Sequence, residues 1–351
     1  LFARSEINMG VDAFRDSLYA MLKRNTFLNI KFENMLDTLG EMSRTDLYSY
    51  LKEWEQLTPL PFYSIGEPEL TKVVNKGGEE FFVLKVLVSN NSDYDGIIQM
   101  NVLQNGWWYQ PMEDPRARKK VEIAAHTSKE FVSVWEEQIR DVEINTMVSG
   151  NLPYMIRQSI GNVKQERNKI VKDTIYTLPE SSLEMPGEVI VDNEDSTLFV
   201  LSTPAVVGLL PKWLDKVEDT SFKYSGISWW RAPLQWTATT NAKYYGKYIR
   251  SAYVIKSGDG SQTATWKIPV PEAGQYELYY HVFKDDELRW NDRLQGEYHF
   301  RVAYDSEMED AYINLRKANE GWEQLGTYYF SADTVRVVLT DECKLRSVTA
   351  D

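Results

Sequence analysis

The stretch PEAGQYELYYHV, residues 271–282, decides the fold class of this chain. It begins with turn residues and continues with aromatic and β-branched side chains, a pattern that predicts a strand entered through a tight turn. Further runs of this kind lie at residues 188–192, 263–268, 298–302, 323–330 and 334–339. Their spacing predicts a β-sandwich of the jelly-roll type over residues 188–351. We expect residues 203–235, which hold Trp213, Trp229 and Trp230, to be an insertion into it.

A second β region precedes this one. Residues 81–88, FFVLKVLV, read as a buried strand, and residues 97–102, IIQMNV, read as its partner across a turn rich in Asn, Asp and Gly. Similar runs follow to about residue 134. We therefore predict an immunoglobulin-like sandwich over residues 59–150. Residues 151–187, with a charged stretch and several Pro and Ser, are predicted to be a linker.

Residues 1–58 have helical periodicity. Apolar residues recur at helical spacing from Val11 to Leu22, with Asn8 as the expected N-cap, and again from residue 32 until Gly40. A third helix is expected to begin after Ser43 or Thr45 and to end before Pro59. The predicted fold class is therefore mainly β with an α-helical N-terminal segment, an immunoglobulin-like sandwich and then a jelly-roll sandwich.

Composition excludes several classes of function. The 351 residues include 39 Lys and Arg against 52 Asp and Glu, a net charge of −13. A chain this acidic is not expected to bind nucleic acid or an anionic membrane surface. The single cysteine, Cys343, excludes an internal disulfide and a cysteine-based zinc site, and a buried structural role is the default for it. Because the chain begins with Leu1 rather than Met, we expect it to be a piece of a longer protein.

No residue group predicts catalysis or a cofactor. The acidic run at residues 192–195 has oxygen ligands suited to Ca²⁺, but an acidic turn is the favoured reading. The acidic run at residues 285–287 is expected to be a solvated loop rather than a pair of glycosidase carboxylates. Residues 258–261, GDGS, lack the ending of a phosphate loop and read as a hairpin turn. We therefore assign no catalytic residue, no metal and no cofactor.

Aromatic residues are the main candidates for function. The chain has 11 Trp and 21 Tyr, and the candidate ligand-binding residues are Trp229, Trp230, Tyr245 and Trp290. A platform of such rings could hold a polysaccharide through the apolar faces of its sugars. Two alternatives stay open for the tryptophan pairs Trp107–Trp108 and Trp229–Trp230: they can pack in the core and at a domain interface, or they can form a patch that docks a missing domain.

The last part of the chain resembles the golvesin C-terminal-like domain, also described as xanthan-lyase carbohydrate-binding-like. Its pieces here are GEVIVDN at residue 187, YYG at residue 244, GDGS at residue 258, PEAGQYEL at residue 271 and LGTYYF at residue 325. The front half is similar to the tail of gluzincin zinc aminopeptidases of the aminopeptidase N-like class, as found in some large bacterial membrane proteins that fuse transporter segments to such a peptidase. That similarity rests on DLYSYLKEW at residue 46, LPFY at residue 60 and INT at residue 144.

The peptidase motif H-E-x-x-H is missing, since His126, His281 and His299 are each followed by another residue than Glu. The resemblance therefore implies a non-enzymatic accessory region that supports or orients a peptidase-like partner, the missing catalytic domain or another protein surface. It also implies an extracytoplasmic location, with membrane attachment only through a parent protein. The alternative function is a carbohydrate-binding module that recognises a polysaccharide through exposed Trp and Tyr.

Overall fold

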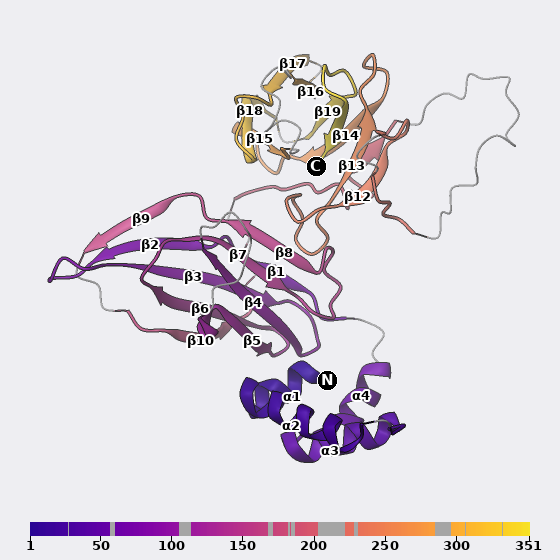
Figure 1. Cartoon of the computed structure of the whole chain (residues 1–351). Helices are drawn as coiled ribbons and strands as arrows, with labels where there is room; N and C mark the ends of the chain where they lie inside the picture. Colours follow the sequence, from indigo (N-terminus) through magenta and orange to yellow (C-terminus); the bar gives the residue numbers. More distant parts are fainter. Residues whose placement is uncertain are drawn as a thin grey trace, which may run out of the picture. The chain divides into compact units, whose positions relative to one another are not determined.

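The chain forms two units, Leu1–Leu183 and Glu184–Asp351 (Figure 1). The structure, a computed structural model, describes residues 1–26, 28–56, 60–104, 114–167, 171–181, 183, 187–202, 222–227, 231–284, 296–305, 307–331 and 333–351. Strands dominate both units, and all α-helices of the described residues lie at the start of the first. The predicted fold class, mainly β with an α-helical N-terminal segment, is confirmed.

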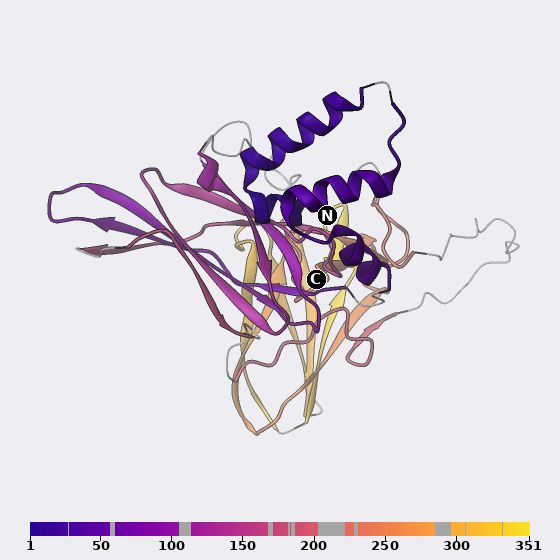
Figure 2. The ribbon, with the colours of Figure 1, turned by 90° about the horizontal axis from the view of Figure 1, so that it is seen from below.

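Four helices open the first unit (Figure 2): α1 (Phe2–Met9), α2 (Val11–Arg24), α3 (Phe32–Ser43) and α4 (Leu47–Gln56). Their common core consists of Phe14, Met21, Leu36, Leu39 and Leu47. Each of these side chains belongs to an apolar stripe at helical spacing, so the helices pack through part of the faces that their periodicity predicts, while Val11 and Leu22 of the same stripe are exposed.

Two expected helix boundaries are wrong. Asn8 lies inside α1, and the break falls at Gly10, whose φ of 86° suits glycine. Gly40 does not end α3, which runs on to Ser43. A side chain at Gly40 would place its Cβ 2.8 Å from the carbonyl oxygen of Thr45, so this glycine admits the close turn into α4.

The rest of the first unit is a sandwich of two sheets. One sheet has the order β10-β6-β3-β2-β9, with β1 also paired to β3, and the other has the order β5-β4-β7-β8. The bounds are β1 (Tyr63–Ile65), β2 (Glu69–Val74), β3 (Glu80–Asn90), β4 (Gly96–Gln104), β5 (Arg118–Ile123), β6 (Thr127–Trp135), β7 (Ile139–Asn145), β8 (Met155–Ser159), β9 (Val163–Arg167) and β10 (Thr174–Pro179), with a short 3₁₀ helix at Pro115–Ala117. Leu84, Ile98, Phe131 and Trp135 are among the buried residues of its core.

Residues 151–187, which we expected to be a linker, instead carry β8, β9 and β10. β8 pairs with β7, β10 pairs with β6, and β9 lies parallel to β2, so these strands extend both sheets. Four of the five residues of β9 are exposed and three of them are charged. Charged edge strands bury few side chains and lack the apolar alternation that predicts a strand.

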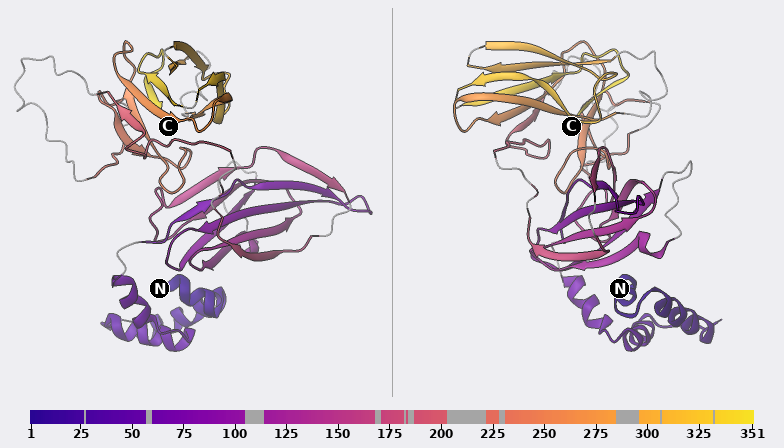
Figure 3. Two further views of the ribbon diagram at one scale, coloured as in Figure 1. Left: turned by 180° about the vertical axis from the view of Figure 1, so that it is seen from behind. Right: turned by 90° about the vertical axis from the view of Figure 1, so that its left-hand side faces the viewer.

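The second unit contains three sheets, of order β11-β14-β19-β16-β17, β12-β13-β20 and β15-β18. Its strands, seen nearly end-on in Figure 1 and from the side in Figure 3, surround a common interior. The bounds are β11 (Phe199–Leu201), β12 (Thr237–Thr240), β13 (Ser251–Lys256), β14 (Thr263–Pro269), β15 (Gly274–Val282), β16 (Glu297–Tyr304), β17 (Glu307–Asn314), β18 (Gly321–Phe330), β19 (Thr334–Thr340) and β20 (Ser347–Ala350). Trp266, Tyr280, Phe300 and Leu339 are among the buried residues of its core.

The expected strands at residues 263–268, 275–282, 298–302, 323–330 and 334–339 are confirmed as β14, β15, β16, β18 and β19. The prediction of a strand at residues 188–192 is wrong. That segment pairs with none of the described strands, and two of its apolar side chains, Val189 and Ile190, are exposed. Most of the insertion expected near residues 203–235 lies outside the described residues.

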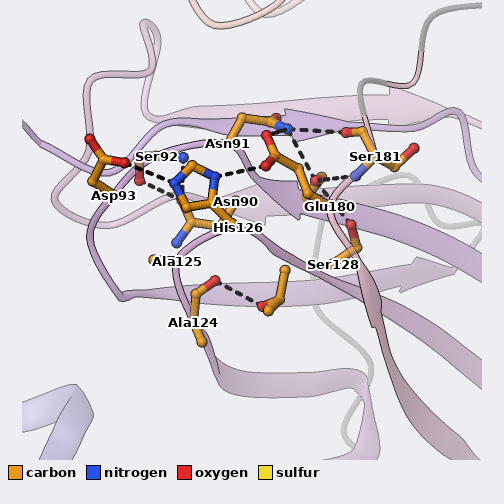
Figure 4. Close-up of polar contacts among 12 residues, drawn as sticks. Asn90, Asn91, Ser92, Asp93, Ala124, Ala125, His126, Ser128, Glu180 and Ser181 are labelled. Atoms are coloured by element: carbon orange, nitrogen blue, oxygen red, sulfur yellow. Dashed lines mark hydrogen bonds and ion pairs between the residues drawn. The ribbon is translucent and has the colours of Figure 1, made fainter.

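A polar cluster holds the chain to the first sandwich just after β10 (Figure 4). The two ring nitrogens of His126 contact the carboxylates of Asp93, at 2.8 Å, and Glu180, at 2.7 Å. Asn91 donates its side-chain amide to Glu180 and to the carbonyl oxygen of Ser181. The hydrogen bonds that the His126 ring donates to the carboxylates, first of Asp93 and then of Glu180, raise the pKa of His126 above its ordinary value.

This cluster predicts a pH-dependent contribution to stability. A histidine whose pKa is raised in the folded state stabilises fully below its unfolded pKa of about 6.5, and this contribution is lost as the pH rises through the folded value. We expect His126→Gln to lower the melting temperature more at about pH 6 than at about pH 8. Melting curves of both proteins across this range measure the difference. An identical pH dependence for the two would contradict the role of His126.

Candidate functional site

The second unit contains a cavity of about 590 Å³. One wall comes from β14 and β19, the opposite wall from β15 and β18, and a third side from the irregular segment at residues 187–192. Its lining is mostly aromatic and aliphatic, with a small number of polar groups. Such a composition is typical of small-molecule binding sites.

The shape of the cavity depends on the two-stranded sheet of β15 and β18. β18 pairs with one edge of β15, and no described strand pairs with the other edge. A bulge interrupts the pair: Leu278 lies opposite Gly326 and Tyr279 lies opposite Gln324, so Leu325 is the extra residue. Leu325 lines the cavity. The bulge therefore adds an apolar side chain to the wall at the point where the ladder is irregular.

Three aromatic rings meet at one end of the cavity. His281 on β15 lies directly opposite Trp322 on β18, with ring centroids 5.4 Å apart. Tyr245, from the loop between β12 and β13, packs edge-on against Trp322 at 4.9 Å and near His281 at 5.8 Å. Trp322 remains 45% exposed. The group thus combines a fixed ring cluster with one large indole surface that is open to solvent.

The buried carboxylate of Asp351 holds two members of this aromatic group, His281 and Tyr245, in place. Its carboxylate contacts Nδ1 of His281 at 2.8 Å and accepts a hydrogen bond from the backbone N–H of Tyr245 at 2.9 Å. Its side chain is 1% exposed. Burial raises the pKa of Asp351, while its bond to His281 acts in the opposite direction.

The hydroxyl of Tyr280 links the same region to the end of β20. It donates to the carbonyl oxygen of Thr349 at 2.6 Å and accepts from the N–H of Asp351 at 3.1 Å. Burial raises the pKa of Tyr280 well above its ordinary value, so this phenol stays a neutral donor. The end of the cavity at which the three rings meet is thus also its polar end, and bonds between β15, β20 and the Tyr245 loop hold it.

A second carboxylate, Asp192, lines the cavity from the irregular segment. It is half-buried and accepts a hydrogen bond from the backbone N–H of Glu194 at 3.0 Å. Desolvation, added to repulsion from Glu194 and Asp351, raises the pKa of Asp192 to about 6.

Of the four candidate ligand-binding residues, the structure places Tyr245 in the cavity wall. Trp229, Trp230 and Trp290 lie outside the described residues, as do Trp107, Trp108 and the acidic run at 285–287. Sequence reasoning did not select His281, Trp322 and Asp351 as site residues. The alternation of 275–282 and 323–330 could have indicated that some aromatic side chains share an outer face, but not the register that joins them.

In the acidic run at residues 192–195, the side chains of Asn193, Glu194 and Asp195 are engaged within the protein. Glu194 accepts from Lys223 at 2.5 Å and from Tyr224 at 2.9 Å, and Asp195 accepts from the N–H of Thr197 at 2.9 Å. Asn193 donates to the carbonyl oxygen of Ser251. Within the described part of the chain, no group of three or more His, Cys, Asp or Glu is placed to hold a metal ion.

The loop at residues 258–261 binds a carboxylate of its own chain. Asp341, which is buried, accepts from the N–H groups of Gly260 at 2.8 Å and Gln262 at 3.2 Å. A Cβ at Gly258 would lie 2.0 Å from an Asp341 oxygen, so glycine is required there. The backbone amides that gave this stretch its likeness to a phosphate loop are therefore occupied by Asp341.

Residues 229–351 match the family model of the Golvesin C-terminal domain. The expected resemblance is confirmed for this part of the chain. The xanthan lyase of Paenibacillus, solved to 2.6 Å resolution, matches with 16% identity and a TM-score of 0.31, over 84% of this chain and 26% of that one. This chain thus spans about a quarter of that solved chain. No curated protein matches.

These comparisons do not bear on the expected similarity of the front half to zinc aminopeptidases, which stays a prediction.

The described helices include none that is long and apolar enough to cross a membrane.

The hydrogen bonds of Asp341 predict that replacing this one side chain destabilises the second unit. We expect Asp341→Ala to lower the free energy of unfolding of the second unit by about 1–3 kcal/mol, because it leaves buried amides without an acceptor. Urea unfolding measures the loss. Asp259→Ala, in the same loop but exposed, is the control and should change stability by less than about 0.5 kcal/mol. Equal effects of the two substitutions would contradict this account.

Proposed function

We propose that the second unit is a carbohydrate-binding module and that its ligand enters the cavity beside Tyr245, His281 and Trp322. The observation that carries the proposal is the partly exposed Trp322, which stands at the opening of an aromatic-lined cavity of about 590 Å³. Binding, rather than catalysis, is the proposed activity of this unit.

The chemistry of the lining suits a sugar. A sugar ring has apolar C–H faces, which can lie on the surfaces of Trp322 and Tyr279, and hydroxyl groups on its rim. Carboxylates and backbone groups at the polar end of the cavity can accept hydrogen bonds from those hydroxyls. The hydrogen bonds around Asp351 hold the aromatic rings in place before a ligand arrives, which lowers the entropy cost of binding.

The family match supports the same proposal. The match covers Tyr245, His281, Trp322 and Asp351, although not the segment at residues 187–192. The resemblance noted in the sequence implies a carbohydrate-binding-like domain, and the cavity supplies a site where such binding can occur.

The accessory role beside a peptidase-like partner remains a prediction, as do the extracytoplasmic location and attachment through a parent protein. One feature of the first unit supports a protein partner for the helices: Val11, Tyr19 and Leu22 on α2 are large apolar side chains that are exposed. This role and carbohydrate binding involve different units, so one does not exclude the other.

Binding of the full chain to a panel of soluble polysaccharides tests the proposed function. We expect Trp322→Ala to weaken binding of the recognised polysaccharide by about tenfold, since it removes the open aromatic surface of the site. Titration calorimetry gives the affinities.

Tyr329→Ala is the matched control. Tyr329 lies on the same strand, β18, and is 66% exposed, but it does not line the cavity. Its loss should leave the affinity unchanged. The proposed function would be wrong if no polysaccharide bound, or if the two substitutions weakened binding equally.

A further inference from the structure

The charged groups of the cavity are nearly all of one sign. Its described lining contains four carboxylates, Glu188, Asp192, Glu277 and Asp351, and one histidine, His281, but no lysine or arginine. An aromatic cavity alone would accept many sugars. The sign of its charges therefore determines which charged sugars it can bind.

The four carboxylates differ in the partner or solvent contact that stabilises their negative charge. Asp351 contacts His281 at 2.8 Å, and Arg250 also interacts favourably with it. Glu277 is exposed to solvent and accepts the hydroxyl of Tyr279 at 2.6 Å. Glu188 is exposed as well. Solvent or a polar partner thus stabilises each of these three.

Asp192 is the exception. It is half-buried, its carboxylate accepts hydrogen bonds from the backbone N–H groups of Glu194 and Asn193, and the charges that act on it within the described residues are negative. A half-buried carboxylate without a cationic partner is costly to keep ionised, and this cost raises its pKa. A cation bound beside it would remove that cost.

We propose that the cavity is specific for sugars that carry a free, protonated amine and that Asp192 receives the amine. This inference rests on the proposed carbohydrate-binding function. The ammonium group is a donor with three N–H bonds, and a carboxylate is the acceptor with which it forms its strongest hydrogen bonds. The sugar ring then lies against Trp322, whose indole surface is partly open to solvent.

Two other ligand classes fit the same residues less well. A uronic acid would bring a fifth carboxylate into a lining that already repels it. A calcium ion takes six to eight oxygen ligands, whereas within the described ranges no three or more His, Cys, Asp or Glu side chains are placed to hold a metal ion. An organic ammonium needs one well-placed carboxylate, which Asp192 supplies.

The test measures binding of the full chain to four oligosaccharides of equal length: glucosamine, N-acetylglucosamine, glucose and galacturonate oligomers. The buffer is held close to neutral, above the pKa of Asp192 of about 6, so that this carboxylate is ionised while the sugar amine still takes up a proton. We expect the glucosamine oligomer to bind about tenfold more tightly than its acetylated counterpart. Asp192→Asn should abolish this difference, because it keeps the shape of the side chain and removes its charge.

Asp195→Asn is the control, since Asp195 belongs to the same acidic turn but binds Thr197 and lies outside the lining. It should leave the preference intact. Equal binding of the acetylated or glucose oligomer, a preference for galacturonate, or an unchanged preference in Asp192→Asn would overturn the inference while leaving carbohydrate binding in place. Absence of binding by any oligosaccharide, tested here and on the wider polysaccharide panel, would overturn both.

Discussion

One buried carboxylate, that of Asp351, determines how the candidate site is built. It contacts His281 on β15 and accepts the backbone N–H of Tyr245, and its own N–H donates to the hydroxyl of Tyr280. These contacts bring together a strand, a loop and the end of β20. A carboxylate that is this fully buried needs all of its partners, so the positions of the rings of Tyr245, His281 and Trp322 depend on it.

The cavity then follows from the irregular part of the sheet. β15 has a pairing partner on one edge only within the described residues, and its ladder with β18 contains a bulge. A regular, fully paired sandwich would close its interior with side chains. Here the open edge and the segment at residues 187–192 leave room, and the lining leaves Asp192 half-buried without a cation.

The strands of the second unit could be predicted from sequence because alternating aromatic and β-branched residues mark them, as in residues 275–282. Tyr245 was found as a candidate for its chemistry alone. His281 and Trp322 could not be found in this way, because they meet only through the register of β15 and β18, two strands that lie about 40 residues apart in the chain. The edge strand β9 was missed because it is charged, and residues 188–192 resembled a strand because Val and Ile favour strands even where no partner is present.

The most direct test of the central claim is a crystal structure of the full chain with a bound oligosaccharide. The account predicts a sugar ring against the indole of Trp322, with polar contacts toward Asp192 and Asp351. A sugar bound elsewhere on the chain, with this cavity closed or filled by the protein's own side chains, would contradict it.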